Sequence, residues 1–173
     1  YKAVKHLLEQ GYRRIMHLGG PEHINVYRSR RQGYLDAMAE AGIDVDPAWI
    51  IEQPLVIEGG KKALEMSMPQ KPDAFFCAGD YAALGVMHEA RKRGISIPGD
   101  MGICGFANEP FTEFLSPSMT SLEQGGVEMG ARVARMFLEC IPGSKSERDC
   151  RKSVIEPELI IIVSIINKLL KTK

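Results

Sequence analysis

The chain has 173 residues, a length that suits a single domain with one hydrophobic core. Apolar residues make up 45% and charged residues 25% of it, as in an ordinary soluble globular protein. Lys and Arg together number 22, as do Asp and Glu, so there is no excess of positive charge to hold a phosphate backbone. The composition therefore argues against DNA binding by this chain alone.

Strand and helix patterns alternate along the sequence. It opens with an apolar helical face that Gly11 ends. The patterns then predict a strand at 15–18, a helix at 27–41, a strand at 49–51, a helix at 58–68, a strand at 73–78, a helix at 80–93, strands at 102–106 and 120–122, a helix at 127–141 and an extended segment at 154–163. Gly42 and Gly94 are the expected ends of two of these helices. Four alternations with short connections predict an α/β fold, a mostly parallel sheet with helices on both faces.

The expected domain covers residues 1–163, with a polar surface loop at 142–152. The tail at 164–173 is predicted to be either a short amphipathic helix or disordered, and the pattern does not decide between them. The chain starts at Tyr1 inside a helical pattern, so we interpret it as a piece of a longer protein. Neither a signal peptide nor an apolar run long enough to cross a membrane is found, and we expect no membrane contact.

Sequence signatures of catalysis, metal binding and phosphate binding are missing. The chain has no phosphate-binding glycine motif, no GxSxG, no HExxH and no CxxC pair. We expect its four cysteines to be buried and reduced, as in a cytosolic protein, and His17 to be a satisfied histidine of the core or sheet edge. The sequence thus predicts no enzymatic activity, no metal and no cofactor.

A ligand site is expected beyond the carboxyl ends of the parallel strands. These ends fall at 19–21, 53–55, 79–80 and 107–108. Their glycines would let the backbone approach a ligand, although each taken singly is better explained by a tight turn. The helix after the first strand begins with Arg28, Arg30 and Arg31, near the same edge. We expect one of these arginines to contact the ligand and the other two to be solvated.

Six segments carry a family resemblance when they are taken in order. They are AVKHLLEQGYRRI at 3–15, HLGGP at 17–21, RSRRQGY at 28–34, PDAFFCAGDYAALG at 72–85, GISIPGDMGICGF at 94–106 and LSPSMTSLEQ at 115–124. Each motif is weak alone, but in this order and spacing they resemble the LacI/GalR (lactose-repressor-like) family of transcription regulators. The resemblance implies a periplasmic-binding-protein-like (type I) lobe, the C-terminal one of two in the effector-binding region. It also implies a first lobe and an N-terminal helix-turn-helix headpiece, neither of which is in this chain.

The resemblance assigns roles to individual residues. Arg30 takes the position of the family's main effector-contacting arginine, and Asp80 that of a helix-capping aspartate beside the site. The other effector-binding positions are Leu55, Gly79, Ala107, Asn108 and Gln124, and the positions where family dimers pack are Leu84, Leu115, Pro117 and Met119. Leu55 replaces an aromatic residue, Gly79 an asparagine and Ala107 an aspartate. These departures argue against an ordinary sugar, and the remaining Arg30 favours an anionic one.

The function implied is that of a cytoplasmic regulator. A sugar or sugar derivative would bind in the cleft between two lobes and change the operator affinity of a homodimer, which touches DNA only through the missing headpiece. Two alternatives share this architecture. A solute-binding protein of a transport system would carry a secretory signal upstream, and an enzyme would need a nucleophile, base or phosphate loop that the strand ends lack.

Overall fold

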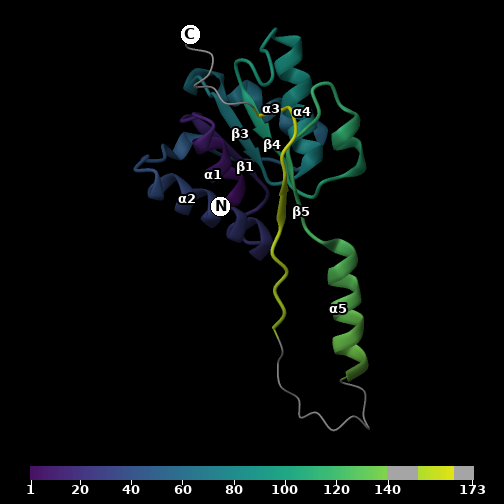
Figure 1. Cartoon of the computed structure of the whole chain (residues 1–173). Coiled ribbons are helices and arrows are strands. Elements are labelled where there is room, and N and C mark those ends of the chain that lie inside the picture. The colour runs from purple at the N-terminus through teal and green to yellow at the C-terminus, as the bar shows by residue number, and fades with distance from the viewer. Residues whose placement is uncertain (140–151, 166–173) are drawn as a thin grey trace.

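The computed structural model describes residues 1–139 and 152–165 (Figure 1). Four parallel strands form the central sheet: β1 (Ile15–Gly19), β2 (Ile50–Glu52), β3 (Ala74–Cys77) and β4 (Gly102–Cys104). Their order is β2-β1-β3-β4, and His17 of β1 faces Ile50 on one side and Phe76 on the other. The predicted parallel sheet is therefore confirmed.

Two pairs of helices cover the sheet, one pair on each face (Figure 1). One face packs under α3 (Ile57–Ser67) and α4 (Asp80–Lys92), and the other under α1 (Lys2–Glu9) and α2 (Asn25–Glu40). Every residue of β1, β3 and β4 is buried, as expected for strands covered on both faces. The prediction of helices on both faces is confirmed.

The helices α3 and α4 approach each other closely because glycines face each other across their contact. A Cβ atom on Gly60 would lie 2.0 Å from the carbonyl oxygen of Ala82, and one on Gly85 would lie 2.0 Å from that of Ile57. Any side chain at either position would push the helices apart, so these two glycines set their spacing.

A second, two-stranded sheet continues the edge beyond β4. It pairs β5 (Ser121–Glu123) with β6 (Glu158–Ile160) in antiparallel register, and parallel bridges tie Cys104 to Thr120 and Ala107 to Glu123. Past β6, the Ser164 hydroxyl donates to the carbonyl of Ile103 at 2.7 Å, and Ile165 is only 5% exposed. The packed lobe thus reaches two residues beyond the predicted boundary at 163, and the remainder of the predicted tail, 166–173, lies outside the described residues.

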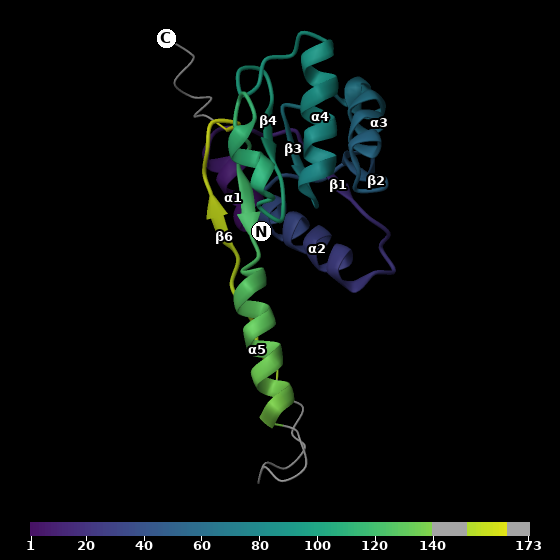
Figure 2. The ribbon, with the colours of Figure 1, turned by 90° about the vertical axis from the view of Figure 1, so that its right-hand side faces the viewer.

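The helix α5 (Gly126–Glu139) leaves the body of the lobe (Figures 1 and 2). It has no buried residue, and its apolar side chains are largely exposed, with Val127 at 92% and Phe137 at 68%. Arg132 ties it to the returning chain by donating to Ser153 Oγ at 3.0 Å. The helix predicted at 127–141 is therefore present, and none of its side chains is buried in the core. The predicted loop at 142–152 lies outside the described residues except for Lys152.

Three short 3-10 helices were not predicted: η1 (Pro47–Trp49), η2 (Met68–Gln70) and η3 (Pro110–Phe114). Each carries a proline at its first or second position, where the missing N–H costs nothing. Within 1–139 and 152–165, no helix combines the length and the apolar character that a membrane span requires.

Candidate functional site

Arg30 of α2 connects the carboxyl ends of three strands. Its Nη1 donates to the carbonyl of Ala78, just after β3, at 2.8 Å, and its Nη2 donates to Oε1 of Gln124, just after β5, at 3.3 Å. The guanidinium carbon lies 3.6 Å from the centre of the Phe106 ring, which follows β4. Three separate strand ends therefore hold this side chain in one orientation, at the edge where the sequence predicts a ligand site.

The charge of Arg30 is not neutralised by any residue that the structure describes. None of the carboxylates in 1–139 and 152–165 forms an ion pair with it. Its two hydrogen-bond partners are neutral oxygens, and its side chain is half-buried. Burial lowers the pKa of Arg30, against smaller raising effects of Tyr27 and Asp80. A guanidinium remains charged in proteins, so this site presents a partly desolvated cation with donors to spare.

The neighbouring arginines have different surroundings. Arg28 donates to Asn25 Oδ1 at 3.0 Å, and Arg31 forms an ion pair with Glu22 at 2.7 Å. Both contacts are local to the start of α2, whereas Arg30 turns toward the strand ends. Only Arg30 of the three is therefore placed at the expected ligand edge. Arg31 was expected to be solvated, but it forms an ion pair instead.

Asp80 does not cap α4, so that prediction is wrong. The N-cap is Gly79, and among the described residues no side chain makes a capping bond there. The buried Asp80 carboxylate instead accepts hydrogen bonds from Ser121 Oγ at 2.7 Å and from the backbone N–H of Glu109 at 2.8 Å. Gly105 permits this approach, because a Cβ there would lie 2.0 Å from Asp80 Oδ1. Burial raises the pKa of Asp80 although these hydrogen bonds lower it, and its carboxylate ties the start of α4 to β5 and η3.

The loop after β4 holds two residues with positive φ, Ala107 at 130° and Asn108 at 54°. Such a conformation costs about 1–3 kcal/mol and persists only where the surroundings enforce it. The Asn108 amide donates to Glu123 Oε2 at 3.3 Å, and its oxygen accepts from Thr112 Oγ1 at 3.4 Å. Both ends of the Asn108 side chain are thus engaged within the lobe, and Ala107 offers only a methyl group.

The predicted pair Leu55 and Gly79 forms an apolar part of the same edge. A Cβ atom on Gly79 would lie 3.5 Å from the Leu55 Cβ, an ordinary contact distance. Gly79 has an extended φ of -174°, so neither its backbone nor its neighbours require a glycine. Leu55 is half-buried against the core beneath α3 and α4.

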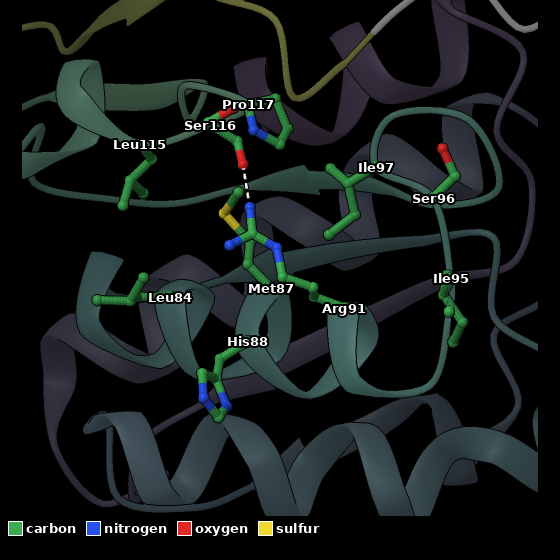
Figure 3. A pocket seen from close by; sticks show the side chains of 11 residues that line it. Leu84, Met87, His88, Arg91, Ile95, Ser96, Ile97, Leu115, Ser116 and Pro117 are labelled. Carbon is green, nitrogen blue, oxygen red and sulfur yellow. Dashed lines mark hydrogen bonds between the residues drawn. The ribbon is translucent and has the colours of Figure 1, made fainter.

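Three of the four predicted dimer residues lie at one surface groove. Leu84 of α4 and the loop residues Leu115 and Pro117 line it together (Figure 3). Met119 is fully buried and packs into the core on the α3 and α4 side, so its prediction as an interface residue is wrong.

Sequence reasoning missed two residues that shape the site. Phe106 stacks under Arg30, and its only sequence signal is an aromatic residue directly after a strand. Glu123 accepts from the backbone N–H of Gly125 at 2.8 Å, and this bond, with that from Asn108, lowers its pKa. Its position beside Gln124, at the end of a strand, could have identified it as a site residue from the sequence.

The other chemistry-bearing residues lie in the core. His17 is buried in the core, one of the two predicted places, and is stacked between the rings of Tyr34 and Phe76 at 5.2 and 5.3 Å. Its Nδ1 has no hydrogen-bond partner among the described residues, so the ring is not fully satisfied as predicted. Burial lowers the pKa of His17 to about 4. Cys77 and Cys104 are free and buried, as predicted, and burial raises their pKa values, whereas Cys140 and Cys150 lie outside the described residues. In the part of the chain that the structure describes, no three His, Cys, Asp or Glu side chains are placed to hold a metal.

An open parallel sheet between two helical layers is an architecture in which ligands bind beyond the carboxyl ends of the strands, the edge where Arg30 lies. Residues 4–164 match the model of the periplasmic binding protein-like domain, and the chain belongs to that family. It is homologous to the transcriptional repressor CytR of Escherichia coli, with 36% identity over 93% of the chain and 47% of the relative. The repressor PurR of Pasteurella multocida is 32% identical over 98% of the chain and 51% of the relative.

Solved structures of transcription regulators also match the fold of this chain. A complex of the transcriptional regulator CelR with cellobiose matches with a TM-score of 0.87 and 29% identity, over 94% of this chain and 50% of that one. A LacI-family regulatory protein from Chloroflexus aggregans matches with a TM-score of 0.87 and 31% identity, over 95% and 59%. The predicted fold and the predicted LacI/GalR resemblance are confirmed. These relatives are named as regulators of transcription, not as enzymes, and the chain spans about half the length of the curated relatives it matches.

Proposed function

We propose that this lobe forms one wall of the effector site of a DNA-binding transcription regulator, and that the effector carries negative charge. The observation that carries the proposal is Arg30, a half-buried cation that three strand ends hold and that forms no ion pair with a carboxylate of residues 1–139 and 152–165. A rigid guanidinium with unused donors suits a carboxylate or phosphate group, which it can bind through two parallel hydrogen bonds.

The rest of the edge supports an anionic sugar derivative over a neutral sugar. Gly79 and Ala107 offer no side-chain partner for hydroxyl groups, and both ends of the Asn108 amide are already engaged. A buried ligand hydroxyl left unpaired costs about 1–3 kcal/mol, so a ligand that depends on several hydroxyl contacts would bind poorly. The Arg30 interaction would therefore provide most of the affinity from this lobe.

Gln124 connects the Arg30 site to the segment that leaves the lobe. It accepts from Arg30 and stands just before α5, the helix that leaves the lobe. An effector that binds Arg30 Nη2 would compete with Gln124 for this donor. It would thereby change the conformation of the chain where it leaves the lobe, just before α5. Effector binding would then bias the angle between two lobes, which is the differential contact that an allosteric switch requires.

The proposal includes two partners and a location. A homodimer would form through the surface that holds Leu84, Leu115 and Pro117, and DNA would be bound through a headpiece outside this chain. The supporting observation is that CytR and PurR, its homologues, are named as HTH-type transcriptional repressors. A regulator of this kind acts on the chromosome, so we place it in the cytoplasm.

Calorimetry on the intact protein tests the effector class. We expect phosphorylated or acidic sugars to bind more tightly than their neutral counterparts, and Arg30→Ala to weaken the best ligand at least about tenfold, near 1.4 kcal/mol. Arg31→Ala is the matched control, because Arg31 pairs with Glu22 instead of facing the strand ends. Tight binding of a neutral sugar that is indifferent to Arg30→Ala would overturn the site and the ligand class together.

A further inference from the structure

The ligand edge holds a fixed carboxylate as well as a fixed guanidinium. Glu123 is the last residue of β5, and its side chain is half-buried. Its Oε1 accepts from the backbone N–H of Gly125 at 2.8 Å, and its Oε2 accepts from the Asn108 amide at 3.3 Å. Because these bonds lower the pKa of Glu123, its carboxyl group is ionised at neutral pH. No cation in the part of the chain that the structure describes forms an ion pair with it.

Arg30 and Glu123 are placed by the same two segments, which run past the ends of β4 and β5. Arg30 stacks on Phe106 of the first segment and donates to Gln124 of the second. Glu123 directly precedes Gln124 and pairs in a parallel bridge with Ala107. Since Ala107 directly follows Phe106, the two charged residues are offset by one residue on each segment, a step of about 3.8 Å. A ligand of sugar size beyond the strand ends can therefore reach both.

Both charged groups keep hydrogen-bonding capacity that the lobe does not use. A guanidinium has more N–H donors than the two that Arg30 uses toward the strand ends. An ionised carboxylate can accept about four hydrogen bonds, and Glu123 accepts the two from Gly125 and Asn108. The edge thus offers spare donors on a cation and spare acceptors on an anion.

We propose that the effector is a zwitterion, with its anionic group on Arg30 and an ammonium group on Glu123. This inference rests on the proposed effector site and deepens it, because it names a second charge on the ligand. A ligand with an anionic group alone would be repelled by the Glu123 carboxylate, whereas an ammonium group at that end makes the same carboxylate a partner. The phosphate ester of an amino sugar has this arrangement of charges.

Calorimetry of the intact protein with matched ligands tests the second charge. The probes are phosphorylated glucosamine and phosphorylated galactosamine, each compared with the phosphorylated parent sugar, which has a hydroxyl in place of the ammonium group. We expect one amino sugar phosphate to bind at least about tenfold more tightly than its hydroxyl counterpart. Glu123→Gln should abolish this preference. Glu9→Gln is the matched control, because it removes an exposed carboxylate at the end of α1, near the amino ends of the strands.

Inorganic phosphate separates an effect of charge from an effect on structure. It carries no ammonium group, so Glu123→Gln should tighten its binding at Arg30 about twofold or more, because a nearby like charge is removed. The readout is a phosphorus NMR titration of the intact protein. If Glu123 only holds the start of α5 through Gly125, the same substitution should instead weaken inorganic phosphate and amino sugar phosphate alike.

The outcomes distinguish this inference from the proposed function on which it rests. Equal binding of the amino and hydroxyl ligands, with Arg30→Ala still weakening both, would overturn the zwitterion alone. A preference for the amino ligand that survives Glu123→Gln would overturn the assignment to Glu123, as would weaker binding of inorganic phosphate to that variant. If none of the phosphorylated sugars binds, the inference and the proposed anionic effector fail together.

Discussion

The buried His17 should make the lobe lose stability in mild acid. Its pKa falls from 6.5 to about 4 because burial removes water from the ring, and the rings of Tyr34 and Phe76 enclose it. Between these two pKa values the histidine is protonated in the unfolded chain but stays neutral in the folded chain. The contribution of His17 to the free energy of unfolding is therefore fully present above pH 6.5 and is lost as the pH falls toward 4. Each pKa unit corresponds to about 1.4 kcal/mol, which gives about 3 kcal/mol in full and about 2 kcal/mol between pH 7.5 and 5.

Urea unfolding at pH 7.5 and pH 5 measures this difference. The wild type should lose about 2 kcal/mol more over this interval than His17→Leu, which cannot titrate at this position. His6, whose pKa burial also lowers, and Asp80, whose pKa burial raises, are present in both proteins, so their contributions cancel. His23→Leu removes an exposed histidine and should keep the wild-type loss, because His17 is still present. Equal acid sensitivity of the wild type and His17→Leu would refute the reasoning.

Two further changes test the packing around the site, each by urea unfolding at neutral pH. Ser121→Ala removes the hydroxyl that donates to the buried Asp80 carboxylate, and should cost about 1–3 kcal/mol; an unchanged free energy of unfolding would show that this tie is dispensable. Gly60→Ala places a methyl group 2.0 Å from the Ala82 carbonyl and should destabilise by at least about 1–3 kcal/mol. Gly130→Ala, in a helix where a Cβ would meet nothing, should instead be neutral or stabilising by up to about 1 kcal/mol.

The layers of the fold were predictable because their signals are local. Gly11, Gly42 and Gly94 end three helices with φ values of 93°, 67° and 71°, the left-handed conformation that a helix end favours in glycine. The strands are short apolar runs between these helices, and a sheet covered on both faces needs no alternation. The place of α5 was not predictable, because an apolar face shows that a helix needs a partner but not where that partner lies.

The site was predictable only in part, because its contacts depend on pairings distant in sequence. Arg30 stands at a strand-to-helix connection, which topology alone brings to the ligand edge. The role of Asp80 was missed because an aspartate at the start of a helix usually caps that helix. Its carboxylate instead accepts a hydrogen bond from Ser121 of β5, a partner that the sequence does not reveal. Met119 lies in an irregular segment, where spacing does not reveal the direction of a side chain.

The position at which the chain leaves the lobe toward α5 is also a position at which the protein can be shortened. Glu123 of β5 and Glu158 of β6 face each other in the antiparallel register, so the chain leaves and re-enters the lobe at adjacent positions. A two-residue turn such as Asn-Gly, put in place of residues 124–157, is therefore long enough to join the two strands. The shortened chain would keep Arg30 stacked on Phe106, lose the Gln124 contact, and lack the exposed apolar surface of α5 that promotes aggregation.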